Sequence, residues 1–112
     1  MSEVRAALRE QLRAAMGARD RPAVQVLRSA LAAIENAEAQ PIEHGGPVTA
    51  VEEAPAAAEV ARRVVTDADA RTIVAAEIDE LQAAVEQYRD LGRDDEADTL
   101  VAQAEVLRSV LG

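Results

Sequence analysis

Three arginines spaced four residues apart, Arg5, Arg9 and Arg13, are the residues of this chain best placed to do chemistry. On a helix this spacing puts them along one edge, where like charges repel by a few tenths of a kcal/mol per pair. Such a stripe indicates a binding edge for phosphate or for another anionic partner. Two simpler interpretations stay open, a solvated face and pairing with the chain's own acidic third helix, expected over residues 67–91. No aromatic residue accompanies the stripe to stack on bases.

The acidic residues predict no metal site. Glu77 and Glu80 are three residues apart, but dinuclear metal bundles pair such a glutamate with a histidine one turn away. The chain has one histidine, His44, and no cysteine, so no second nitrogen or sulfur ligand can complete a site. We therefore expect a solvated acidic helix face, and a loop position for His44.

The residues that most enzyme sites require are also missing. The chain has no Cys, Lys, Trp or Phe and a single tyrosine, Tyr88, which falls in register with an apolar stripe and is expected in the core. Gly45 and Gly46 are not followed by the lysine that a phosphate-binding loop needs. We predict no catalytic residue and no cofactor, and a binding role in preference to an enzymatic one.

Charge is distributed unevenly along the 112 residues, whose net charge is −9. Residues 1–40 hold six arginines against five acids, whereas residues 41–112 hold six against sixteen. A surface of this sign repels nucleic acid on average, so we expect no DNA binding and at most weak binding of tRNA. With no signal-like amino terminus and no apolar run of about 20 residues, the protein is expected in the cytoplasm and not in a membrane.

The composition predicts an all-α fold, because 26 of the residues are alanine, the best helix former. A first antiparallel helical hairpin is expected over residues 2–40. Its first helix runs to about residue 18, with Ser2 as N-cap and a stripe of Val4, Leu8, Leu12 and Met16. Gly17 lies near the expected stop. Asp20 is expected to cap the second helix, with Pro22 in its first turn.

A second hairpin is expected over residues 66–111. Thr66 and Asp69 resemble a capping box, Gly92 is placed for a left-handed turn, and Asp94 is expected to cap the last helix. Between the hairpins, the proline and glycine content of residues 41–65 predicts a long loop. Val60, Val64 and Val65 are the residues that could attach this loop to the helices. Together these elements predict one small four-helix domain over residues 1–112.

Two blocks of sequence resemble a known family. The first reads AMGARD at residues 15–20, VLR at residues 26–28 and AAIENAE at residues 32–38; the second reads TDAD at residues 66–69, YRDLGRDD at residues 88–95 and EVL at residues 105–107. Their order and spacing are similar to those of the YqeY family, often called GatB/YqeY-like. The resemblance covers nearly all of residues 12–111 except the loop, and it identifies the chain with the family's amino-terminal helical domain.

The resemblance implies a non-catalytic binding or adaptor module, with a protein partner or a partner linked to tRNA or to assemblies like the tRNA-dependent amidotransferase. The family carries a label of carbon–nitrogen ligase with glutamine as amido-N-donor, but it offers no catalytic residues to place on this chain. A structural module that associates with itself, for example as a homodimer, is the main alternative. The ligase activity comes third.

Overall fold

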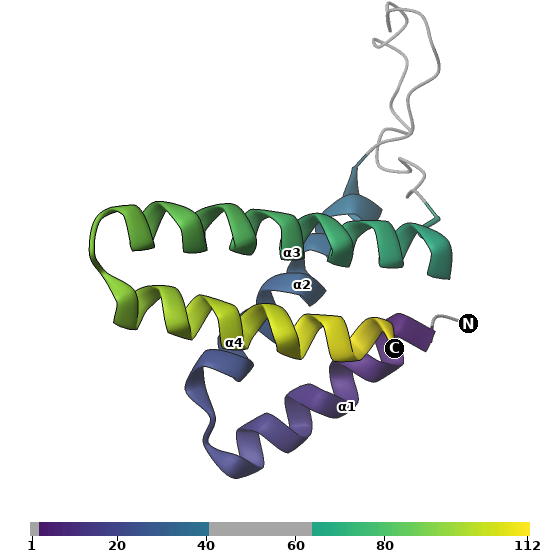
Figure 1. The fold of residues 1–112 in the computed structure, drawn as a ribbon. Helices are drawn as coiled ribbons and strands as arrows, with labels where there is room; N and C mark the ends of the chain where they lie inside the picture. The colour runs from purple at the N-terminus through teal and green to yellow at the C-terminus, as the bar shows by residue number, and fades with distance from the viewer. Residues whose placement is uncertain (1–2, 41–63) are drawn as a thin grey trace, which may run out of the picture.

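A computed structural model describes residues 3–40 and 64–112, and this part of the chain is all-α, with four helices and no strand (Figure 1). The helices are α1 (Glu3–Ala18), α2 (Arg21–Ala39), α3 (Asp67–Asp90) and α4 (Asp94–Leu111). The predicted fold class is therefore confirmed. The expected N-cap Ser2, His44 with the Gly45-Gly46 pair, and most of the predicted loop lie outside the described residues.

The helices form two hairpins that pack against each other. α3 and α4 lie side by side and antiparallel, while α1 and α2 form a wider V (Figure 1). α2 passes behind the α3–α4 hairpin and packs mainly on α4, and α1 contacts both α3 and α4 near the end of the molecule where the chain finishes. The turn between α1 and α2 is consequently left at the outside of the molecule.

The core is built from aliphatic side chains and alanine. Its largest fully buried side chains are Leu8, Leu27, Ile34, Leu107, Val4 and Val74. Ala30, Ala70 and Ala97 are buried completely and let the helices approach closely. Val65 packs against this core, as the sequence suggested for the end of the loop, whereas Val64 is exposed.

One core prediction is wrong, because Met16 is 51% exposed although it continues the stripe of Val4, Leu8 and Leu12. Residues four apart on an α-helix are offset by about 40°, since the helix has about 3.6 residues per turn. After three such steps Met16 has rotated about 120° away from Val4. Ala15 takes the buried position instead.

Both hairpin turns have the same backbone geometry. In the first, the Arg19 amide donates to the Met16 carbonyl (3.1 Å) and the Asp20 amide to the Ala15 carbonyl (3.0 Å). In the second, Gly92 and Arg93 make the equivalent bonds to Arg89 (3.0 Å) and Tyr88 (2.8 Å). These are paired Schellman bonds, and in each turn the residue that donates the first of the two bonds is left-handed. Glycine fills that position in the second turn, with φ 76°, but an arginine, Arg19, fills it in the first, with φ 58°.

The helix starts agree with the sequence in two cases out of three. The Asp20 carboxylate accepts from the Ala23 amide (3.2 Å), and Thr66 with Asp69 forms the predicted capping box. Asp94 does not cap α4: Arg93 occupies the N-cap position without a side-chain cap bond, and Asp94 is the first residue of the helix. The tight turn starts α4 immediately after Arg93, so the three acids that begin the helix act on its dipole instead. At the other end of a helix, Gly17 lies one residue before the last residue of α1, Ala18, close to the stop expected from the sequence.

The start of α1 is held by another helix. The Asp67 carboxylate, at the start of α3, accepts a hydrogen bond from the Val4 amide (2.9 Å) and lies 3.5 Å from the Arg71 guanidinium. Amides in the first turn of a helix have no partner within the helix, so a carboxylate from a neighbouring element can take the place of a local cap. This bond ties the two hairpins together at one end of the molecule.

Candidate functional site: the arginines of the first hairpin

The predicted arginine stripe is divided by the fold. Arg5 donates two hydrogen bonds to Glu38 on α2, from Nη1 to Oε1 at 3.2 Å and from Nη2 to Oε2. Both side chains are mostly buried, with 17% and 28% of their surface exposed. The hydrogen bonds to Glu38 raise the pKa of Arg5. Arg5 therefore fastens α1 to α2, whereas the internal pairing suggested by the sequence was with the acidic third helix.

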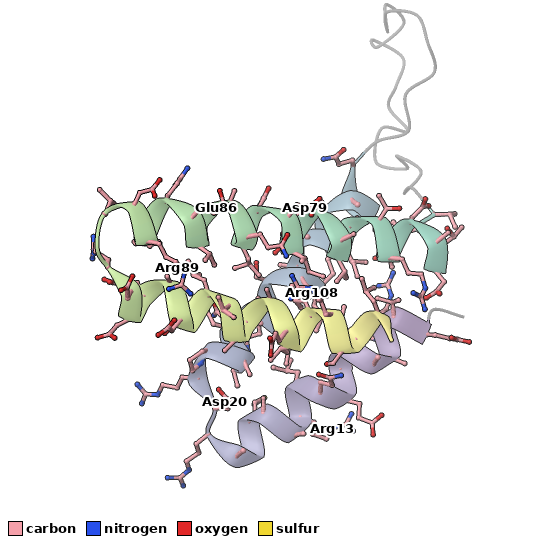
Figure 2. All side chains as sticks on the ribbon, in the orientation of Figure 1. Arg13, Asp20, Asp79, Glu86, Arg89 and Arg108 are labelled. Carbon is pink, nitrogen blue, oxygen red and sulfur yellow. The ribbon has the colours of Figure 1, made fainter. Side chains whose placement is uncertain are left out.

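Arg9 and Arg13 remain on the surface. Both side chains are exposed, and neither makes an ion pair with the described residues (Figure 2 labels Arg13). Two of the three stripe arginines are thus open to a partner from outside.

Three further arginines gather at the turn end of the hairpin. Here a shallow groove of about 790 Å³, which we call the Met16 groove, is lined by Met16, Arg19, Arg21, Val24, Gln25 and Arg28. The Arg28 Nη2 atom lies 4.0 Å from the Met16 Sδ atom. Arg19, Arg21 and Arg28 are exposed, and none of them pairs with an acid in the described part of the chain.

The register of the hairpin explains this gathering of positive charge. Arg5 meets Glu38 at the open end of the hairpin, and Met16 meets Arg28 near its turn. Glu35 adds to the negative charge near Arg5. At the turn, the acid between Arg19 and Arg21 in the sequence is Asp20, whose carboxylate accepts a hydrogen bond from the Ala23 amide of α2. Arg19, Arg21 and Arg28 were not predicted as binding residues from the sequence. The signal that could have found them was the hairpin itself, which folds residues 19–28 back beside Met16.

The α3–α4 hairpin has the opposite character. Its described residues, 64–112, hold twelve acids against four arginines, and Asp79 and Glu86 show this acidic character on α3 (Figure 2). Three of the four arginines are paired within the hairpin. They are Arg71 with Asp67, Arg89 with Asp94 and Asp98, and Arg93 with Glu96. Unpaired positive charge in the described residues is therefore concentrated on the first hairpin.

The acidic pair and the tyrosine considered in the sequence lie outside the arginine surface. Glu77 accepts a hydrogen bond from the Ser29 hydroxyl of α2 (3.2 Å), and Glu80 is exposed. Across residues 3–40 and 64–112, no three potential ligands come together as a metal site would require. Tyr88 is half-buried, and the Arg93 guanidinium stacks 5.4 Å from its ring centre, next to the left-handed Gly92.

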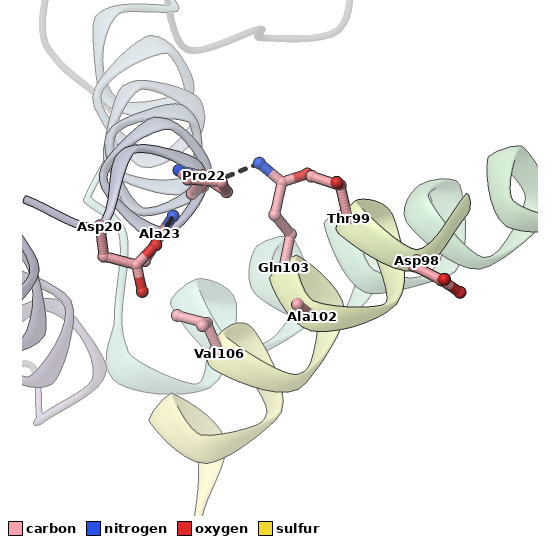
Figure 3. A pocket seen from close by; sticks show the side chains of 8 residues that line it. All are labelled: Asp20, Pro22, Ala23, Asp98, Thr99, Ala102, Gln103 and Val106. Atoms are coloured by element: carbon pink, nitrogen blue, oxygen red, sulfur yellow. Dashed lines mark hydrogen bonds between the residues drawn. The ribbon is translucent and has the colours of Figure 1, made fainter. Parts of the chain in front are cut away.

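A second hollow, of about 290 Å³, lies where the start of α2 meets α4 (Figure 3). The buried Gln103 side chain crosses it, and its Nε2 donates to the Pro22 carbonyl at 2.9 Å. Asp20 and Asp98 lie at its rim. The Thr99 hydroxyl also lines the hollow, and it donates to the Asp95 carbonyl of its own helix at 3.3 Å. The bond from Gln103 to Pro22 joins α4 to α2 across the hollow.

Among the helices of the described residues, none has a stretch long and apolar enough to cross a membrane. No protein-family model matches the chain, and no curated protein or solved structure matches it either. The resemblance to the YqeY family therefore stays a prediction.

Proposed function

We propose that this protein is a non-catalytic binding or adaptor module that engages an anionic partner through the first hairpin. The observation that carries the proposal is the concentration of unpaired arginine there. Arg9, Arg13, Arg19, Arg21 and Arg28 are exposed without an acidic partner in the described residues, in a chain with a net charge of −9. A chain with 21 acids could have neutralised these arginines internally, as it does Arg5.

Binding by such a surface needs no reacting group. Guanidinium groups present several N–H donors in a fixed plane that matches carboxylate and phosphate. Charged surface groups of this kind steer encounter and select partners more than they add affinity. The surface therefore suits an adaptor that must find one acidic partner among many neutral ones.

The resemblance to the YqeY family supports the same class of role, with a protein partner or one linked to tRNA. The carbon–nitrogen ligase label of that family has no residues to support it on this chain. A second candidate is self-association, which the opposite charges of the two hairpins favour. Analytical ultracentrifugation over a wide concentration range tests it: a dimer shows sedimentation that depends on concentration and on salt.

Site-specific photo-crosslinking in cells that naturally produce the protein tests the proposal. A photoreactive residue at Gln25, in the Met16 groove, is compared with one at Ala76, an exposed position on α3. We expect a discrete crosslinked species from position 25 and none from position 76. Equal crosslinking at both positions, or crosslinking at position 76 alone, would contradict a binding surface on the first hairpin.

A further inference from the structure

We infer that the Met16 groove receives a short acidic segment of a partner protein, in which an apolar side chain lies between carboxylates. This inference rests on the proposed function and adds the place and chemistry of the contact. The apolar side chain would pack on Met16 and Val24, and the carboxylates would pair with Arg19, Arg21 and Arg28.

The floor of the groove is apolar and accessible. Met16 is one of three large hydrophobic residues that are exposed in the described part of the chain; the other two are Val64 and Leu91. Met16 lines the groove, and Val24 beside it is only partly covered. The unbranched, polarisable side chain of methionine adapts to different apolar groups. The floor can therefore hold an aliphatic or aromatic anchor.

The rim of the groove selects for carboxylate. Arg19 comes from the turn, Arg21 from the start of α2, and Arg28 from about two turns further along the same helix, and all three line the groove with Met16. An arginine and a carboxylate can form two parallel hydrogen bonds, which fixes orientation as well as adding binding energy. Gln25 adds a polar group to the same surface.

The backbone at Arg19 is an independent observation. The left-handed conformation there, φ 58°, is the one that Gly92 adopts in the equivalent turn of the second hairpin. Glycine takes this conformation without steric cost, whereas other residues do not. Backbone strain of this kind is concentrated at functional sites. The chain carries an arginine where glycine is favoured, and that arginine lines the groove.

Charge complementarity favours a short segment over RNA. The twelve acids of residues 64–112 would repel a long polyanion that runs beyond the groove. The few carboxylates of a short bound segment would instead stay close to the groove arginines. At physiological ionic strength, screening over about 8 Å confines favourable attraction to the neighbourhood of the groove. The groove also offers no aromatic ring for stacking against bases.

The probe for this inference is a displayed library of random short peptides, selected on the full chain at physiological ionic strength. We expect the selected peptides to carry an apolar residue flanked by Asp or Glu. Their affinity should fall by about tenfold in Arg28→Gln, because the variant loses a charged hydrogen bond to the peptide. Met16→Ser should weaken them too. The matched variant Arg108→Gln, which removes an exposed arginine of α4, should bind as the original chain does.

Other outcomes would overturn the inference. Peptides without acidic residues, or peptides insensitive to Arg28→Gln and Met16→Ser, would place binding elsewhere. Labelled tRNA that binds through the same arginines, with no peptide enriched, would assign the groove to RNA. Dimerisation lost in Arg28→Gln would assign it to a second copy of the chain. In each of these cases crosslinking from Gln25 decides separately whether the first hairpin is the binding surface.

Discussion

At the scale of single residues, Arg5 and Arg9 have different roles although they lie one helical turn apart. Arg5→Gln removes a largely buried ion pair and should lower the free energy of unfolding by about 1–2 kcal/mol. Arg9→Gln changes an exposed side chain without an acidic partner in the described residues, and should change it by less than about 0.5 kcal/mol. Urea denaturation of the two variants measures the difference. Equal effects would mean that the Arg5–Glu38 pair does not fasten α1 to α2.

The Arg93–Glu96 pair makes a prediction about pH. The hydrogen bond from Arg93 lowers the pKa of Glu96 below its ordinary value. A carboxylate with a lowered pKa stabilises the folded state above its unfolded pKa, and loses this contribution as the pH falls through the folded pKa. In Arg93→Gln the pKa of Glu96 should rise toward the ordinary value. An NMR titration of the Glu96 side chain measures it; a pKa that does not move would rule out the pair in solution.

Residues that act on their own helix were predictable from the sequence, and residues that act across helices were not. The caps at Asp20 and Thr66 and the left-handed Gly92 follow local rules of helix ends. The bond from Val4 to Asp67 joins residues 63 positions apart and depends on how the hairpins dock. The bond from Gln103 to Pro22 also depends on how the hairpins dock.

At the scale of elements, the two hairpin turns form a natural comparison. Arg19→Gly should raise the free energy of unfolding by up to about 1 kcal/mol, because it relieves a left-handed non-glycine residue. Gly92→Ala should lower it by about 1 kcal/mol, and Gly92→Val by more, since a β-branched residue fits this region poorly. A Cβ at Gly92 would meet nothing within 4 Å, so the effect comes from the backbone alone.

Thermal or urea unfolding of the turn variants gives both signs in one experiment. A destabilised Arg19→Gly variant would show that the Arg19 side chain contributes to folding, and would remove the argument that it is present for binding. A Gly92→Ala variant as stable as the original chain would contradict the left-handed turn.

The helices themselves were predictable, but their exposed faces were less so. Apolar residues four apart identified α1, yet the drift of about 40° per step took Met16 out of the core. That rotation turned a predicted core residue into the floor of a groove. The predicted start of α4 was also wrong, for a different reason. The tight turn places Arg93, and not Asp94, at the N-cap position.

At the scale of the whole molecule, the alanine-rich composition and two short turns were enough to predict an all-α fold of two hairpins. The predicted arginine stripe and the Met16 groove lie on the same hairpin but at different places. The stripe of Arg5, Arg9 and Arg13 was visible along one helix, whereas Arg19, Arg21 and Arg28 meet Met16 only after the chain reverses. Charge segregation between the hairpins, by contrast, was already visible in the sequence, where residues 1–40 hold six arginines against five acids and residues 41–112 hold six against sixteen.

The most direct test of a binding surface on the first hairpin compares two variants of equal charge. Arg19→Gln with Arg28→Gln removes two groove arginines; Arg89→Gln with Arg108→Gln removes two from the second hairpin (Figure 2). Circular dichroism first confirms that both variants fold. Each is then used, beside the original chain, to capture the partner crosslinked at Gln25, quantified by mass spectrometry. We expect recovery to fall at least about tenfold in the groove variant and to stay unchanged in the other. Equal loss in both would show that total charge governs binding, and the first hairpin would then have no special role.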